Sequence, residues 1–119
     1  MPAPAIVNHM FEMQVEDIFT ISGRGTVFLG TIRSGAVSVG DNVVCKTPQA
    51  EVFSRVIGLE EPKSGRAMDR AEANSATIAV VCKTIDHKTL VGAWQGEGEG
   101  ARVVGVTLSP GAKKRWWQS

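Results

Sequence analysis

The sequence lacks tyrosine, has only two cysteines and two histidines, and contains no long apolar run. No stretch approaches the roughly 18 apolar residues that a membrane-spanning helix needs. The N-terminus, Met-Pro-Ala-Pro-Ala, has neither the basic nor the apolar region of a secretory signal. We therefore expect no membrane partner and a cytoplasmic location, where the two thiols stay reduced.

An excess of charge of one sign is also missing. The chain carries 13 Lys and Arg against 12 Asp and Glu, a formal net charge of +1. No global basic field therefore draws the chain to nucleic acid, and only local patches can do so. The most marked patch is the C-terminal tail, in which Lys113, Lys114 and Arg115 are followed directly by Trp116 and Trp117.

The residue patterns of common enzymes and cofactor sites are absent as well. Cys45 and Cys82 are too far apart for a CxxC motif, and each ends a valine pair, which predicts buried strand thiols. His9 and His87 have no companions at metal-ligand spacing. The chain has no GxxxxGK[ST] phosphate loop and no recognisable nucleophile–base set. We expect no enzymatic activity, no metal or other cofactor, and no binding of GTP.

What the sequence does have is many β-branched residues, with 15 Val, 7 Ile and 8 Thr, and 13 scattered glycines. This composition favours short strands joined by tight turns, and 119 residues leave room for one domain. Seven or eight strands at spacings near ten residues predict an all-β fold, an antiparallel barrel or sandwich. We divide the chain into an N-terminal extension (1–10), the β domain (11–108) and a basic, aromatic tail (109–119). The residues predicted to be buried are Phe11, Val15, Val27, Val43, Val56 and Val80.

Some segments give weaker signals. Gly30 lies inside the strand expected at 26–33 and predicts a bulge or bend there. Residues 66–73 belong to the second half of the polar segment 60–75 and fit either two helical turns or a loop. A short strand is expected at 90–94. A single last strand is expected at 102–108, with Val104, Val106 and Leu108 on one face.

Residues 15–27 (VEDIFTISGRGTV) resemble the first hairpin of domain II of elongation factor Tu and related translational GTPases. Gly30, Gly35 and residues 39–43 fall where that domain has its glycines and its Val-Gly-Asp/Glu-x-Val turn. Residues 56–60 look like its strand ending Gly-Ile/Val-Glu, and 79–83 look like a later strand. The resemblance covers roughly residues 11–94. It implies a small closed antiparallel β-barrel, here without the GTPase domain, and a role in handling RNA on the ribosome.

The resemblance also implies binding residues. In elongation factor Tu, domain II holds the 3′ end of aminoacyl-tRNA, and Glu60 matches the glutamate that lines the pocket for the terminal adenine. Lys83 ends the strand expected to neighbour Glu60, and Arg24 is presented between two glycines at a loop tip. Together with the tail, the candidate contacts for RNA or a protein partner are Arg24, Glu60, Lys83, Lys113, Lys114, Arg115, Trp116 and Trp117.

Two functions remain open at this point. The first is a non-catalytic module that binds RNA or a ribonucleoprotein partner. The alternative is a protein–protein module with no nucleic-acid role, in which a lone barrel covers its exposed surface by forming a homodimer. Arg24 could instead bond across its own turn, and Glu60 could be a solvated carboxylate at a strand end. The tail would also suit a membrane surface or a protein groove, or its tryptophans could fold back on the barrel.

Overall fold

The computed structural model describes residues 11–111, except 75 and 97. This part of the chain is all-β, and its helical content is two short 3-10 turns. Within it, no helix has the length and apolarity needed to cross a membrane. The strands are β1 (Glu12–Ile21), β2 (Gly25–Ser34), β3 (Ala36–Ser38), β4 (Asn42–Lys46), β5 (Glu51–Glu61), β6 (Arg66–Met68), β7 (Arg70–Glu72), β8 (Thr77–Cys82), β9 (Trp94–Gln95), β10 (Arg102–Val103) and β11 (Val106–Pro110), and the 3-10 turns are η1 (His87–Thr89) and η2 (Gly98–Gly100).

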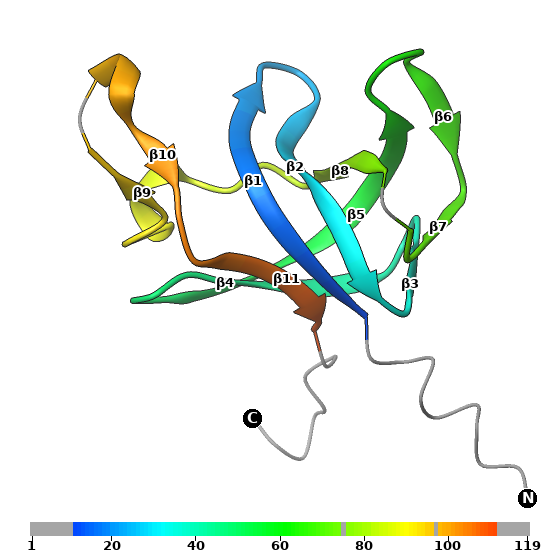
Figure 1. The fold of residues 1–119 in the computed structure, drawn as a ribbon, viewed down its shortest axis with the longest axis horizontal. Coiled ribbons are helices and arrows are strands. Elements are labelled where there is room, and N and C mark those ends of the chain that lie inside the picture. The colour runs from blue at the N-terminus through cyan, green and yellow to red at the C-terminus, as the bar shows by residue number, and fades with distance from the viewer. Residues whose placement is uncertain (1–10, 75, 97, 112–119) are drawn as a thin grey trace, which may run out of the picture.

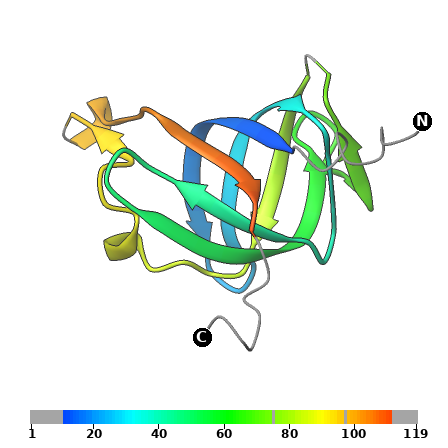
Figure 2. The same ribbon diagram turned by 90° about the horizontal axis from the view of Figure 1, so that it is seen from below.

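Six of these strands form a hydrogen-bonded ring. The order is β4-β11-β1-β2-β8-β5, and β5 pairs back onto β4. Every pairing in the ring is antiparallel. Viewed from below, the ring strands surround a common centre (Figure 2). β6 extends the sheet beyond β5, β3 pairs with β7, and β9 with β10 forms a separate small lobe (Figure 1).

The core fills the inside of this ring because alternate strand residues point inward. Its largest fully buried side chains include Phe28, Met13, Leu59 and Leu108. All six residues predicted to be buried are buried, with at most 4% of their surface exposed. Val27, however, belongs to a second cluster with Ala79 and Val81. These residues alternate with the core residues Phe28 and Val80, so the second cluster lies on the outer face of β2 and β8.

The bulge predicted at Gly30 is confirmed. Val15 pairs with Gly30 and Asp17 with Leu29, so Glu16 has no partner in the ladder. A Cβ atom on Gly30 would lie 1.9 Å from the carbonyl oxygen of Gln14, so only glycine fits this position. The extra residue shifts the phase of β1, which allows both Val15 and Ile18 to point into the core.

Three local expectations were wrong. Residues 66–73 form neither helix nor loop but the short strands β6 and β7, because Gly65 turns the chain back onto the end of β5. Residues 90–94 are not a strand, and β9 begins only at Trp94. The last strand is interrupted at Gly105, whose φ is +71°, so Val104 is 36% exposed while Val106 is fully buried. β11 then continues past Leu108 to Pro110.

Candidate functional site

Arg24 and Glu60, two of the predicted site residues, bind each other. The backbone N–H of Arg24 donates to the carbonyl of Ile21 at 2.9 Å, which shapes the turn between β1 and β2. The guanidinium Nη2 of Arg24 forms an ion pair with Glu60 Oε2, on β5. The side chain of Arg24 is therefore committed to another strand rather than to its own turn. The carboxylate of Glu60 is paired rather than simply solvated.

Lys83 lies away from this pair. Strands β5 and β8 are neighbours as expected, but Glu60 pairs with Ala79 rather than with Lys83. The N–H of Lys83 donates to the carbonyl of Arg55 at 3.0 Å. Arg55 and Glu60 are separated by about 17 Å along β5, at about 3.4 Å per residue. The predicted tail contacts Lys113 to Trp117 lie outside the described residues.

Lys83 lines an open groove with a volume of about 630 Å³. One wall comes from β5, where Phe53 and Arg55 share the outer face because they are two residues apart. The other wall comes from residues 83–86 and Thr89. Phe53 is 63% exposed, which makes it the most exposed large hydrophobic side chain in the described part of the chain. The groove is lined by Asn42, Val52, Phe53, Ser54, Arg55, Lys83, Thr84, Ile85, Asp86 and Thr89.

The cations of this groove keep most of their binding capacity. Arg55 donates Nε–H to the carbonyl of Gly40 at 3.3 Å. Its two terminal nitrogens bond no other residue among those described, and neither does the ammonium of Lys83. Asp86 supplies the one carboxylate among the lining residues, and its Oδ1 accepts the N–H of Lys88 at 2.9 Å as the cap of η1. Two cations and an aromatic face are thus open to an anionic ligand with aromatic parts.

A buried hydroxyl holds the second wall in place. Thr26, on β2, is fully buried, and its Oγ1 accepts the N–H of Ile85 at 2.8 Å. Ile85 in turn packs into the core. The segment that carries Lys83 and Thr84 is therefore fixed on both sides, since the backbone carbonyl of Lys83 accepts a hydrogen bond from Ser54 Oγ at 3.2 Å.

The sequence reasoning missed Phe53 and Arg55. A usable signal was present, because an aromatic and a cationic residue at positions i and i+2 of an expected strand must share a face. What the sequence did not reveal was the register of β5 against β8, which brings Arg55 next to Lys83.

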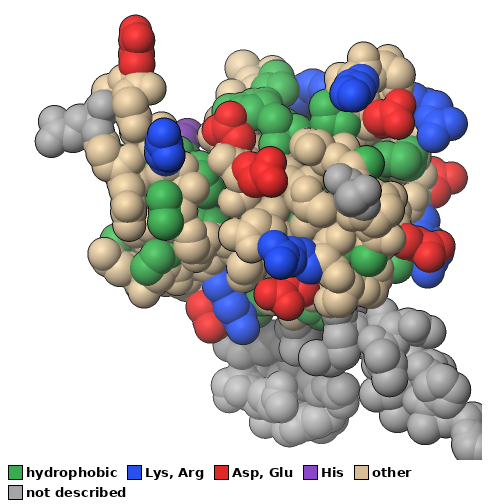
Figure 3. Space-filling view, viewed as in Figure 1, with side chains coloured by type: hydrophobic (Ala, Val, Ile, Leu, Met, Phe, Trp, Pro, Cys, Tyr) green, Lys and Arg blue, Asp and Glu red, His purple; other side chains and the backbone are tan. Residues whose placement is uncertain are grey.

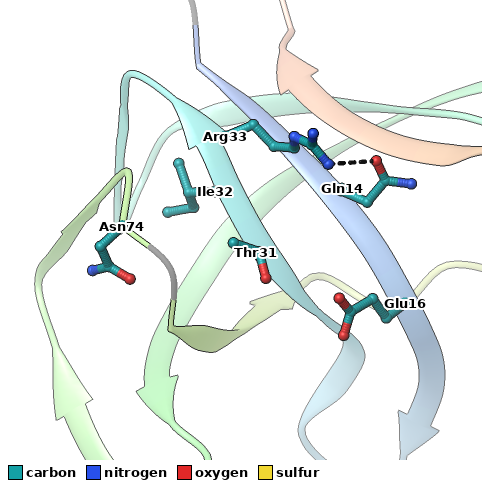
Figure 4. Close-up of a pocket in the computed structure, with 6 residues that line it drawn as sticks. All are labelled: Gln14, Glu16, Thr31, Ile32, Arg33 and Asn74. Carbon is teal, nitrogen blue, oxygen red and sulfur yellow. Dashed lines mark hydrogen bonds between the residues drawn. The ribbon is translucent and has the colours of Figure 1, made fainter.

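Two other cavities differ in character. The first, about 390 Å³, lies over β1 and β2 and is lined by Gln14, Glu16, Thr31, Ile32, Arg33 and Asn74 (Figure 4). Arg33 and Gln14 point toward each other and are joined by a hydrogen bond of 3.2 Å, while Glu16 lies at the other end of the cavity. The one cation of this cavity, Arg33, therefore already has a partner, and its one carboxylate, Glu16, would repel an anionic ligand.

The second cavity, about 340 Å³, lies between β6, β7 and the start of β8. Its apolar lining includes Ile32, Met68 and Ile78. Of its four charged lining residues, Arg70 pairs with Glu72 and Glu61 accepts a hydrogen bond from Ser64 at 2.5 Å, whereas Arg66 is an exposed cation. Charged side chains of both signs are also interspersed over the face of the molecule shown in Figure 3, so no field of one sign forms there.

Both cysteines are free and buried, as predicted. Burial raises the pKa of the Cys45 thiol to about 12. Burial also raises the pKa of Cys82 to about 12, reinforced by the nearby Cys45 and partly opposed by a hydrogen bond with Ser54. Because the thiolate is the nucleophile, these groups are poorly suited to nucleophilic chemistry.

His87 packs against Trp94, with ring centroids 5.0 Å apart and an interplanar angle of 27°. Among the residues described, no three His, Cys, Asp or Glu side chains come together in a way that could hold a metal ion. No protein-family model matches the chain.

Proposed function

We propose that this chain is a non-catalytic module that binds RNA, and that the groove of Phe53, Arg55 and Lys83 is part of the binding surface. The observation that carries the proposal is the exposed phenyl ring beside two cations whose charged ends have little else to bond. Cations contact the phosphates of a nucleic acid, and exposed aromatic rings stack on unpaired bases.

The proposal extends to the fold type. We propose that the six-stranded ring is a closed β-barrel of the type found in domain II of elongation factor Tu. The ring of pairings and the bulge at Gly30 support this, together with the resemblance of residues 15–27. These 119 residues contain no GxxxxGK[ST] phosphate loop, so we expect the purified chain to show no binding of GTP by calorimetry.

A salt titration tests the function. Fluorescence anisotropy of a labelled single-stranded RNA, measured from 20 to 200 mM salt, should show affinity falling steeply with salt concentration. Substituting both Arg55→Ala and Lys83→Ala should reduce the magnitude of the log–log slope by about 1.4, since each phosphate contact on a single strand contributes about 0.7. Phe53→Ala should weaken binding while leaving the slope almost unchanged.

Matched control cations are available beyond the other end of β5. Lys63 and Arg66 are exposed cations near the opposite end of β5. Replacing both with alanine removes the same charge but should change the affinity less than threefold. If wild-type protein does not bind RNA even at 20 mM salt, or if the control pair weakens binding as much as the groove pair, the proposal is wrong.

A second function is favoured by a different observation. The outer-face cluster of Val27, Ala79 and Val81 is bordered by Phe19 and Ile57, which are 37% and 44% exposed. Such a partly exposed apolar surface suits self-association. Analytical ultracentrifugation distinguishes the two functions. If the protein does not bind RNA and forms a dimer that Ile57→Lys converts to a monomer, the protein–protein function is favoured.

A further inference from the structure

The groove has two chemically different ends. The segment that follows β8 runs antiparallel to β5, and the N–H of Lys83 donates to the carbonyl of Arg55 at 3.0 Å. Beyond Lys83 this segment runs toward Phe53, which lies about 7 Å from Arg55 at about 3.4 Å per residue. Asp86, three residues after Lys83, therefore lines the groove on the side of Phe53. Two cations lie at one end of the groove, and an aromatic ring and a carboxylate lie at the other.

Hydrogen bonds hold Asp86 in a fixed orientation. Its Oδ1 accepts the N–H of Lys88 at 2.9 Å, which caps η1. Its backbone carbonyl accepts both the N–H and the hydroxyl of Thr89, at 2.9 and 2.7 Å. Its Oδ2 has no hydrogen-bond or ion-pair partner within the described part of the chain. The groove thus contains a preorganised acceptor with one oxygen free.

The charges determine how a nucleotide fits the groove. Its phosphate is attracted by Arg55 and Lys83 and repelled by the carboxylate of Asp86. With the phosphate at the cationic end, the base lies against the phenyl ring of Phe53, which is 63% exposed. The edge of that base then faces a carboxylate, which accepts hydrogen bonds and donates none.

We propose that Asp86 selects the base in this groove, by accepting a hydrogen bond on Oδ2 from the exocyclic amino group of an unpaired cytosine, adenine or guanine. The assignment rests on the proposed function and adds its ligand class, a single strand with amino-bearing bases. Carboxylates pair with the N4 amino group of cytosine. Uracil has no amino group, and its one donor, N3–H, is flanked by two carbonyl oxygens that repel a carboxylate.

Cytosine and uracil provide the sharpest comparison, because the two bases have the same size and differ in the group at C4 and the protonation of N3. Labelled oligocytidine and oligouridine of equal length are titrated with the full chain at neutral pH and low salt, and binding is followed by fluorescence anisotropy. We expect oligocytidine to bind at least about fivefold more tightly, the low end of what one specific contact to a base edge contributes.

Asp86→Asn tests the residue while keeping its structural role. Asparagine is as good an N-cap as aspartate, so the hydrogen bond from Lys88 is retained. The amide replaces the free oxygen with an N–H donor, which suits the O4 of uracil. The preference for oligocytidine should therefore disappear or reverse, even though removing a negative charge strengthens the binding of both strands.

Asp17→Asn is the matched control. The Oδ1 of Asp17 also accepts a backbone N–H, that of Ile18 at 2.9 Å, but Asp17 lies on β1 and does not line the groove. The substitution removes the same charge and should leave the preference for oligocytidine unchanged.

The outcomes separate base selection from RNA binding itself. If wild-type protein binds the two strands equally, or if Asp86→Asn keeps the wild-type preference, Asp86 does not select the base. The same conclusion follows if Asp17→Asn abolishes the preference as completely, because net charge rather than a contact would then be responsible. In each of these cases a salt slope that depends on Arg55 and Lys83 leaves the proposed function intact. If wild-type protein binds neither strand at low salt, both proposals fail.

Discussion

At the residue scale, the contrast between paired and unpaired cations matters most. Arg24 is bound to Glu60, whereas Arg55 and Lys83 line a groove with little competition for their charged ends. The earlier assignment of Arg24 and Glu60 as RNA contacts stays a prediction. Their ion pair is partly exposed, with side-chain exposures of 47% and 27%, so solvent screens it and its contribution to stability is small.

We therefore predict that Arg24→Ala changes the free energy of unfolding by no more than about 1 kcal/mol. Its effect on the RNA salt slope should be smaller than that of Lys83→Ala, because the charge of Arg24 is already neutralised by Glu60. Denaturant unfolding and anisotropy check the two parts. If Arg24→Ala reduces the salt dependence of RNA binding more than Lys83→Ala does, the main phosphate contact lies at the β1–β2 turn instead.

The cysteines give a second residue-scale prediction. With pKa values raised from 9.0 to about 12, their thiolate fraction at pH 8 is about a thousandfold lower than that of an unperturbed thiol. Native protein should react with a thiol-specific disulfide reagent far more slowly than protein in denaturant, where both thiols should react. Rapid labelling of either cysteine in the folded state would contradict their burial.

The raised pKa values of the two thiols also predict that the free energy of unfolding depends on pH. The folded state holds the thiol protons more tightly than the unfolded chain, so the stability from burying neutral thiols is fully present below about pH 9. It is lost as the pH rises from about 9 to about 12. A Cys45→Ala variant, although less stable overall, should lose stability less steeply across this range in denaturant titrations.

At the scale of elements, Gly30 determines how β1 and β2 fit together. A side chain at this position would meet the backbone carbonyl of Gln14 at 1.9 Å, and backbone atoms cannot rotate away as a flexible side chain can. Gly30→Ala should therefore destabilise the protein by several kcal/mol, measured by denaturant unfolding. Gly65→Ala is the matched control for an open site, since no atom lies within 4 Å of a Cβ there, although its φ of +73° adds some strain. A cost at Gly30 no larger than that at Gly65 would mean that the strands do not approach so closely.

The hydrogen bond between β2 and the segment after β8 is the second element-scale test. Thr26→Val keeps the shape of the side chain but leaves the buried N–H of Ile85 without its acceptor, which should cost about 1–3 kcal/mol. Thr26→Ser retains the hydroxyl and should preserve this bond. Ile85 fixes the segment that carries Lys83, so Thr26→Val should also weaken RNA binding. Unchanged RNA binding would mean that the groove wall does not need the hydrogen bond between Thr26 and Ile85.

The elements also show how far sequence reasoning could go. Alternation of apolar residues predicted the buried face at the start of β1, and a glycine inside an expected strand predicted the bulge at Gly30, because both are local signals. Local signals failed for 66–73 and for the break at Gly105. β6 folds back onto the nearby end of β5, and β10 pairs with the nearby β9, but β7 forms only through pairing with the distant β3. The groove was missed for the same reason, since the register that joins Arg55 to Lys83 is a long-range property.

At the scale of the whole molecule, the outer side of the six-stranded ring has two neighbouring surfaces of different chemistry. One carries the apolar cluster around Val27 and Val81, with Phe19 and Ile57 at its margins. The other carries the groove and the start of the tail. The first suits a protein neighbour and the second suits a nucleic acid. The two adjoin, because Ile57 follows Arg55 by two residues on β5 and Val81 precedes Lys83 by two, so a large partner on the apolar cluster should compete with RNA in the groove.

Mapping the bound RNA by amide chemical-shift changes is the most direct test of the account. A single-stranded RNA titrated into labelled full-length protein should shift the amides of Phe53, Arg55, Lys83 and Thr84 most, together with those after Gly111. The amides of Val27, Ala79 and Val81 should stay nearly unchanged. Shifts concentrated on that outer-face cluster, or no shifts at low salt, would contradict the assignment of the groove as the RNA-binding surface.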